Sequence, residues 1–144
     1  MKLFFDFLFS RNRAAQTDPM TSFALLLLRL WVGLFMALGH GWGKLTTFAD
    51  LAAKFPDPFG LGSSLSLGLA VFAEFFCSLA IAAGFATRGA LIPLIITMAT
   101  AGLIIHGDDP FGKRELALLY LAPYVALLFT GPGRYSLDRV FSKK

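Results

Sequence analysis

The sequence predicts an all-α integral membrane protein, folded as a four-helix bundle with its N and C termini in the cytoplasm. The composition supports this class, because 56% of the residues are hydrophobic and only 15% are charged, against about 25% charged residues in a typical soluble domain. The charges also leave four apolar stretches of roughly the ~20 residues that a helix needs to cross the hydrocarbon core. The net charge of +4 therefore reflects Lys and Arg in loops, and no nucleic-acid partner is expected.

The first span, predicted over residues 22–43, is the element that the other helices must cover. It carries Arg29 and His40, and Lys44 follows its end directly. At about 100° per residue these three residues share a stripe about 80° wide with Gly33 and Met36. A charged residue at depth in the bilayer costs about 3 kcal/mol on insertion scales. The stripe is therefore expected to face the protein interior.

The chain before this span allows two interpretations. Residues 1–21 form either a loosely ordered tail or a short helix on the membrane surface, because an apolar, phenylalanine-rich run lies there beside Lys2, Arg11 and Arg13. The run Asp18-Pro19-Met20-Thr21-Ser22 is typical of a helix start, and we expect Thr21 or Ser22 to be the N-cap.

Three further spans complete the expected transmembrane domain over residues 22–133. They are predicted over residues 64–84, 88–106 and 114–131, and a basic cytoplasmic tail follows over residues 134–144. Proline and glycine make the segment before the second span rich in turns. The connection between the second and third spans is so short that these two helices must be antiparallel neighbours.

The distribution of basic residues predicts the orientation, because cytoplasmic loops carry more Lys and Arg. Eight lie on the side of the termini (Lys2, Arg11, Arg13, Arg88, Arg134, Arg139, Lys143 and Lys144), and four lie on the other side (Lys44, Lys54, Lys113 and Arg114). Both termini are therefore expected in the cytoplasm.

Two groups of polar residues are expected inside the bundle. At ~1.5 Å per residue, Arg29 and Glu74 lie about 10 Å and about 15 Å from the cytoplasmic end, which predicts a buried ion pair between them. Such a pair either clamps two helices together or serves a functional site.

The second group lies near the outer ends of the spans. His40, Lys44, His106 and Glu115 are expected at similar depth. They form either a pocket for a quinone or another small ligand, or a polar network beside the lipid headgroups. Two His and one carboxylate could also bind a metal ion, but spacing across loops is weak evidence for such a site, and no metal is predicted.

These residues and their order resemble the DoxX family of small membrane proteins. The resemblance rests on Arg29, the run LGHGWGK, the mid-span Glu in VFAEFFCSLAIAAGFATRGA, His106, Glu115 and the closing GPGRYSLD. It implies a four-helix bundle in the bacterial inner membrane and a link to quinone-dependent oxidation. The sequence has no CxxC, haem-attachment or dinucleotide-binding motif, so neither haem, flavin nor an iron–sulfur cluster is expected.

Three functions are compatible with these features. The first is a membrane subunit of a quinone-linked oxidoreductase system, with a polar pocket on the periplasmic side and a partner subunit that carries electrons. The second is a non-enzymatic membrane anchor or assembly partner. The third is a small proton-coupled transporter, which would require a homo-oligomer because four helices enclose little space. In each case membrane lipid is a partner of the chain.

Overall fold

The computed structural model describes residues 18–141, and the regular structure in this part of the chain is entirely helical. The first long helix consists of α3 (Pro19–Met36), the π-helical segment η1 (Ala37–Gly41) and α4 (Trp42–Thr46). After α5 (Phe48–Leu51), the second consists of α6 (Ser63–Val71), η2 (Phe72–Cys77) and α7 (Ser78–Ala83). The third consists of α8 (Thr87–Ala99) and η3 (Thr100–Ile105), and α9 (Phe111–Thr130) and α10 (Leu137–Phe141) follow. The tail or surface helix expected at the N-terminus lies outside the described residues up to residue 17.

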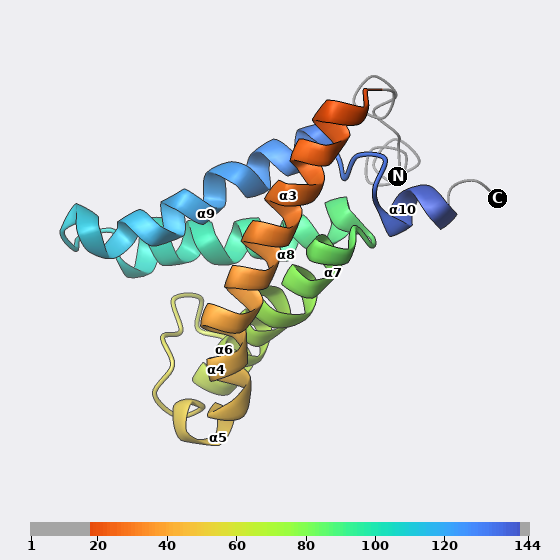
Figure 1. Ribbon diagram of the computed structural model, residues 1–144. Helices are drawn as coiled ribbons and strands as arrows, with labels where there is room; N and C mark the ends of the chain where they lie inside the picture. The colour runs from red at the N-terminus through yellow and green to blue at the C-terminus, as the bar shows by residue number, and fades with distance from the viewer. Residues whose placement is uncertain (1–17, 142–144) are drawn as a thin grey trace, which may run out of the picture.

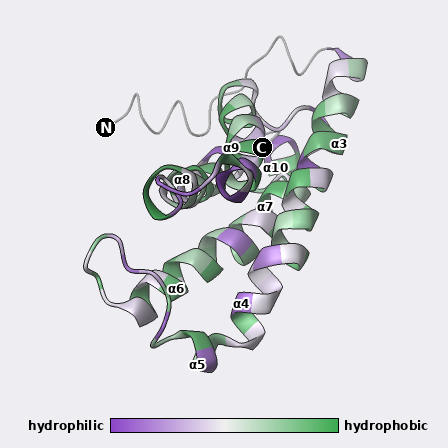
Figure 2. Ribbon diagram, turned by 90° about the vertical axis from the view of Figure 1, so that its left-hand side faces the viewer, coloured by the Kyte–Doolittle hydropathy of each residue, from purple (hydrophilic) through white to green (hydrophobic). Residues whose placement is uncertain are grey.

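Three of these helices are long and apolar enough to cross a membrane. They cover Pro19–Thr46, Ser63–Ala83 and Thr87–Ile105. Figure 2 shows hydrophobic colours along most of their length, with hydrophilic residues gathered in the connections and near α10. The all-α membrane class predicted from the composition is thereby confirmed.

The helices form two antiparallel pairs. α3 packs on α7, and α8 packs on α9. The second pair runs across the first rather than alongside it (Figure 1). Apolar side chains from both pairs form the core, among them Met36, Ile81, Leu91, Leu94 and Leu127. At the end that carries α4 and α5, the first pair extends beyond the second pair (Figure 1).

Two glycines determine how the first and second helices fit together. A Cβ added at Gly33 would lie 2.7 Å from the Ser78 carbonyl oxygen, and one added at Gly41 would lie 2.7 Å from the carbonyl carbon and oxygen of Glu74. Real Cβ atoms do not approach backbone so closely, so only glycine permits this spacing. The two contacts set the register, with Gly33 opposite Ser78 and Gly41 opposite Glu74.

The start of α3 differs from the expected one in its cap. Asp18, rather than Thr21 or Ser22, is the N-cap, and its carboxylate accepts hydrogen bonds from the backbone N–H groups of Met20 and Thr21. Pro19 occupies the first helical position, where its missing N–H is not needed. The hydrogen bonds from the Thr21 hydroxyl and backbone lower the pKa of Asp18, so the cap carries its charge at neutral pH.

The C-terminal segment completes the turn between α7 and α8. Gly84 and Ala86 both have positive φ in this turn, at 71° and 44°. The carboxylate of Asp138 accepts hydrogen bonds from the backbone N–H groups of Ala86 (2.6 Å) and Thr87 (3.0 Å), and its own N–H donates to the Gly84 carbonyl (2.8 Å). Asp138 thus caps α8 from a distant part of the chain.

We predict that Gly41→Ala separates the first and second helices, because its methyl group would overlap the backbone of Glu74. The matched control is Gly43→Ala, where a Cβ meets no atom within 4 Å. Thermal unfolding in detergent should show a lower Tm for Gly41→Ala and an unchanged Tm for Gly43→Ala. Equal Tm values for the two variants would contradict the close contact.

We also predict that Asp138→Ala destabilises the fold by about 1 kcal/mol, the usual cost of losing an N-cap. Asp108→Ala serves as the control, because it removes an exposed carboxylate that caps no helix. The comparison is made by urea unfolding of the detergent-solubilised proteins. If both variants unfold at the same urea concentration, Asp138 does not hold the turn.

Candidate functional site

A cavity of about 270 Å³ lies between the first three helices and the connection from α5 to α6. Its walls are mainly apolar and include Phe55, Phe59, Leu69, Ile96 and Ile105. Its polar lining comes chiefly from Lys44, Glu74 and His106, with hydroxyls of Ser66, Thr97 and Thr100. We call this space the Glu74 cavity. No residue of α9 lines it, so it is formed by the first, second and third helices and the connection from α5 to α6.

An ion pair joins Lys44 to Glu74 in the wall of this cavity. The Lys44 Nζ lies 2.5 Å from Glu74 Oε2. The Glu74 side chain is only 7% exposed and that of Lys44 is 24% exposed. An isolated carboxylate at this depth would be strongly unfavourable, and the lysine offsets that cost. The ammonium group keeps further N–H donors for a second acceptor.

The predicted ion pair between Arg29 and Glu74 is wrong. The depth estimate placed both residues within reach of each other, but the register puts Gly41 opposite Glu74. Arg29 precedes Gly41 by 41 − 29 = 12 residues, which is about 18 Å along a helix. Lys44 is instead one turn beyond Gly41, and helical side chains lean back toward the N-terminus. Lysine is therefore the cation that meets Glu74.

Arg29 contacts the C-terminal segment instead. Its Nη2 donates to the Tyr135 carbonyl at 2.5 Å, and its guanidinium lies directly on Gly84, where a Cβ would be 1.8 Å from Nη1. The residue is completely buried. Asp138 is an acidic charge that acts on it. Arg29 therefore ties the first helix to the α7–α8 turn at the end of the molecule opposite the Glu74 cavity.

The four residues expected to form the outer pocket are only partly together. Lys44 and His106 both line the Glu74 cavity. His40 packs edge-on against the Tyr120 ring, with 6.0 Å between the ring centroids, and Glu115 is exposed. Within residues 18–141 no three His, Cys, Asp or Glu side chains lie close enough to hold a metal ion.

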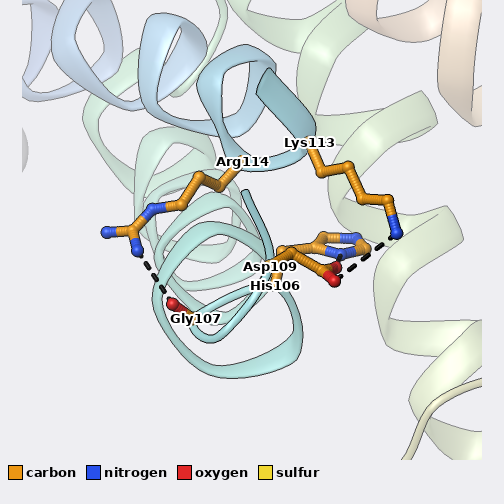
Figure 3. A network of polar contacts seen from close by, with 5 residues as sticks. All are labelled: His106, Gly107, Asp109, Lys113 and Arg114. Atoms are coloured by element: carbon orange, nitrogen blue, oxygen red, sulfur yellow. Dashed lines mark hydrogen bonds and ion pairs between the residues drawn. The ribbon is translucent and has the colours of Figure 1, made fainter. Parts of the chain in front are cut away.

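His106 has an acidic partner that the sequence analysis missed. Its Nδ1 lies 2.8 Å from Asp109 Oδ2 (Figure 3). The spacing HxxD across a turn is a signal that could have suggested this pair, because residues three apart in a tight turn approach each other. The sequence predicts only a turn-rich connection for the Pro- and Phe-rich run at residues 55–61, whereas in the structure this run lines the cavity.

All three helices around the cavity contain a π-helical segment. Glu74 lies within η2, Thr100 and Ala101 lie within η3, and Lys44 follows η1 by three residues. Short π-helical segments interrupt the regular hydrogen-bond ladder and are frequent at functional sites. Their coincidence around one space supports the Glu74 cavity as the candidate site.

Comparison with known proteins identifies the family of this chain. The DoxX family model matches residues 24–107, which is more than half of the chain. The chain is 35% identical over 109 residues to the inner membrane protein YqjF of Escherichia coli, with 72% of this chain and 82% of that protein covered. It is 27% identical over 127 residues to an uncharacterized protein of Haemophilus influenzae, with 83% and 84% covered. No solved structure matches.

The matched region covers the first helix from residue 24 onward, the second and third helices, and every residue that lines the Glu74 cavity. With three helices able to cross a bilayer, the chain is an inner-membrane protein, and it belongs to the DoxX family.

Proposed function

We propose that the protein is a membrane subunit of a quinone-linked oxidoreductase system and that the Glu74 cavity holds the quinone ring. The observation that carries this proposal is the Lys44–Glu74 pair, with its buried carboxylate, set in mainly apolar walls. Small-molecule sites typically combine apolar walls with a few polar groups that orient the ligand. The volume of about 270 Å³ is just below the usual range of ~300–1,000 Å³, which suits a single ring better than a large ligand.

The polar groups of the cavity match the chemistry of a quinone. The Lys44 ammonium can donate a hydrogen bond to a ring carbonyl, and the Glu74 carboxylate can accept one from a hydroxyl of the reduced ring. Phe55 and Phe59 in the α5–α6 connection offer flat apolar surface for the ring. The residues of this chain bind the ring and handle protons, and electrons would pass between the quinone and a partner protein.

The proposal includes a membrane orientation. We place both termini in the cytoplasm, following the excess of Lys and Arg on that side, so that the Glu74 cavity faces the periplasm. We also take α9 as a fourth span, because it is 20 residues long and packs along α8. Its charged residues Lys113, Arg114 and Glu115 are confined to its first two turns, where they can reach the interface.

We predict that replacing the ion pair abolishes quinone binding without unfolding the protein. Lys44→Met alone leaves a buried carboxylate unpaired and should cost about 3 kcal/mol of stability. The double variant Lys44→Met/Glu74→Met should recover most of that stability, because an apolar pair often replaces a buried ion pair without loss. It should nevertheless bind a short-chain benzoquinone at least tenfold more weakly, as measured by equilibrium binding to purified protein.

The control for this experiment is Lys54→Met, which removes an exposed lysine outside the cavity and should leave binding unchanged. A double variant that unfolds at the wild-type temperature and binds the quinone normally would refute the site. If the wild-type protein binds no quinone and co-purifies with none, the oxidoreductase role fails. Proton flux in reconstituted vesicles would then identify a transporter, and its absence would favour an anchor or assembly partner.

A further inference from the structure

His106 is the ionisable residue in the lining of the Glu74 cavity that the Lys44–Glu74 ion pair does not engage. Its Nδ1 contacts Asp109 Oδ2 at 2.8 Å, while its Nε2 has no partner among residues 18–141. Lys113 Nζ lies 3.4 Å from the other carboxylate oxygen of Asp109 (Figure 3). A histidine with one nitrogen held by a carboxylate and the other directed elsewhere is the arrangement that fixes an imidazole for proton exchange.

The loop that carries Asp109 is held in place by its own contacts. Arg114 Nη1 donates to the Gly107 carbonyl at 2.9 Å, and the Asp109 backbone N–H donates to the His106 carbonyl at 3.2 Å. Gly107 has no room for a side chain, because a Cβ there would lie 2.5 Å from the Leu103 carbonyl oxygen. The loop therefore presents Asp109 to His106 in a defined geometry without help from a ligand.

The groups around Asp109 keep its carboxyl group ionised. The hydrogen bond from His106, aided by the charge of Lys113, holds the pKa of Asp109 below its ordinary value. The group therefore stays a carboxylate at neutral pH and can only accept hydrogen bonds. Nδ1 must then carry a proton, and Nε2 is left with its lone pair in the neutral ring.

We propose that Asp109 is a positioning residue that fixes His106 as the Nδ1–H tautomer, so that Nε2 is the proton acceptor of the Glu74 cavity. In the step that this permits, a hydroxyl of the ligand gives its proton to Nε2, and the bonding electron pair stays on the ligand oxygen. The ring becomes an imidazolium, and Asp109 remains unprotonated. The ligand in this step rests on the proposed function, whereas the tautomer does not.

The charged groups around His106 come from two directions. Lys44 and Glu74 face the same cavity from the first and second helices. Asp109 contacts His106 from the loop, and Lys113 contacts Asp109 from α9. Because Glu74 is already paired with Lys44, Asp109 is the carboxylate that decides which nitrogen of the His106 ring carries the proton.

The substitution Asp109→Asn tests the tautomer directly. Lys113 can only donate hydrogen bonds, so the new amide should keep its oxygen toward Lys113 and turn its NH₂ group toward Nδ1. Nδ1 must then accept, and the proton should move to Nε2. Asp108→Asn makes the same change of charge at the neighbouring exposed residue and should leave the tautomer as in the wild type.

The readout is the pair of ring ¹⁵N chemical shifts of His106, measured in detergent without ligand at alkaline pH, where imidazole is neutral. His40→Gln in each background removes the other histidine signal. The expected result is Nδ1–H in the wild type and in Asp108→Asn, and Nε2–H in Asp109→Asn. A wild-type ring protonated on Nε2, or the same tautomer in both Asn variants, would overturn the proposal.

A second measurement separates this proposal from the proposed function. If the wild-type protein binds a short-chain benzoquinol, Asp109→Asn should weaken that binding at least tenfold and Asp108→Asn should not. A reversed tautomer with no quinol binding by the wild type would leave the assignment of Asp109 standing and remove the quinone as the ligand. Equal quinol binding by both Asn variants would show that Nε2 does not accept the hydroxyl proton.

Discussion

The close contact between the backbones of the first two helices is the constraint on which the site depends. Gly33 and Gly41 allow these helices to approach so closely that a Cβ at either position would overlap the opposite backbone. Helix pairs in membranes gain much of their stability from such packing, because lipid offers no hydrophobic drive for association. The contact sets the register, and the register brings Lys44 rather than Arg29 to Glu74. A shift of one turn would leave the carboxylate without a cation.

Much of the architecture could be predicted from the sequence because it follows from hydropathy. The inward-facing stripe from Arg29 to Lys44 is an example, since its polar members are buried or half-buried while Trp31 and Leu38 on the other side are exposed. Hydrocarbon rejects charge regardless of what the other helices do, so the face could be identified from one helix alone. The partner of each charge could not, because pairing depends on the register between two helices.

At the site, too, the polar residues could be predicted from the sequence, but their contacts could not. Lys44, Glu74 and His106 were all singled out as polar residues in apolar surroundings, and the structure brings all three to one cavity. Asp109 was missed because a carboxylate in a loop is ordinary, and only the fold of that loop turns it toward His106. His40 was expected in the pocket from its depth, but its direction around the helix places it against Tyr120. Depth can be estimated by counting residues, whereas direction requires the π-helical segments to be known.

The cap that Asp138 places on α8 has a consequence for how the protein is made. The backbone N–H groups of Ala86 and Thr87 receive their carboxylate from a residue near the end of the chain. During synthesis the second and third helices leave the ribosome well before that residue exists. The second and third helices therefore enter the bilayer before their connecting turn has this cap, and a nascent chain that ends before Asp138 lacks it. Docking of the segment that carries Asp138 onto helices already in the membrane is therefore a late step in the biogenesis of this protein.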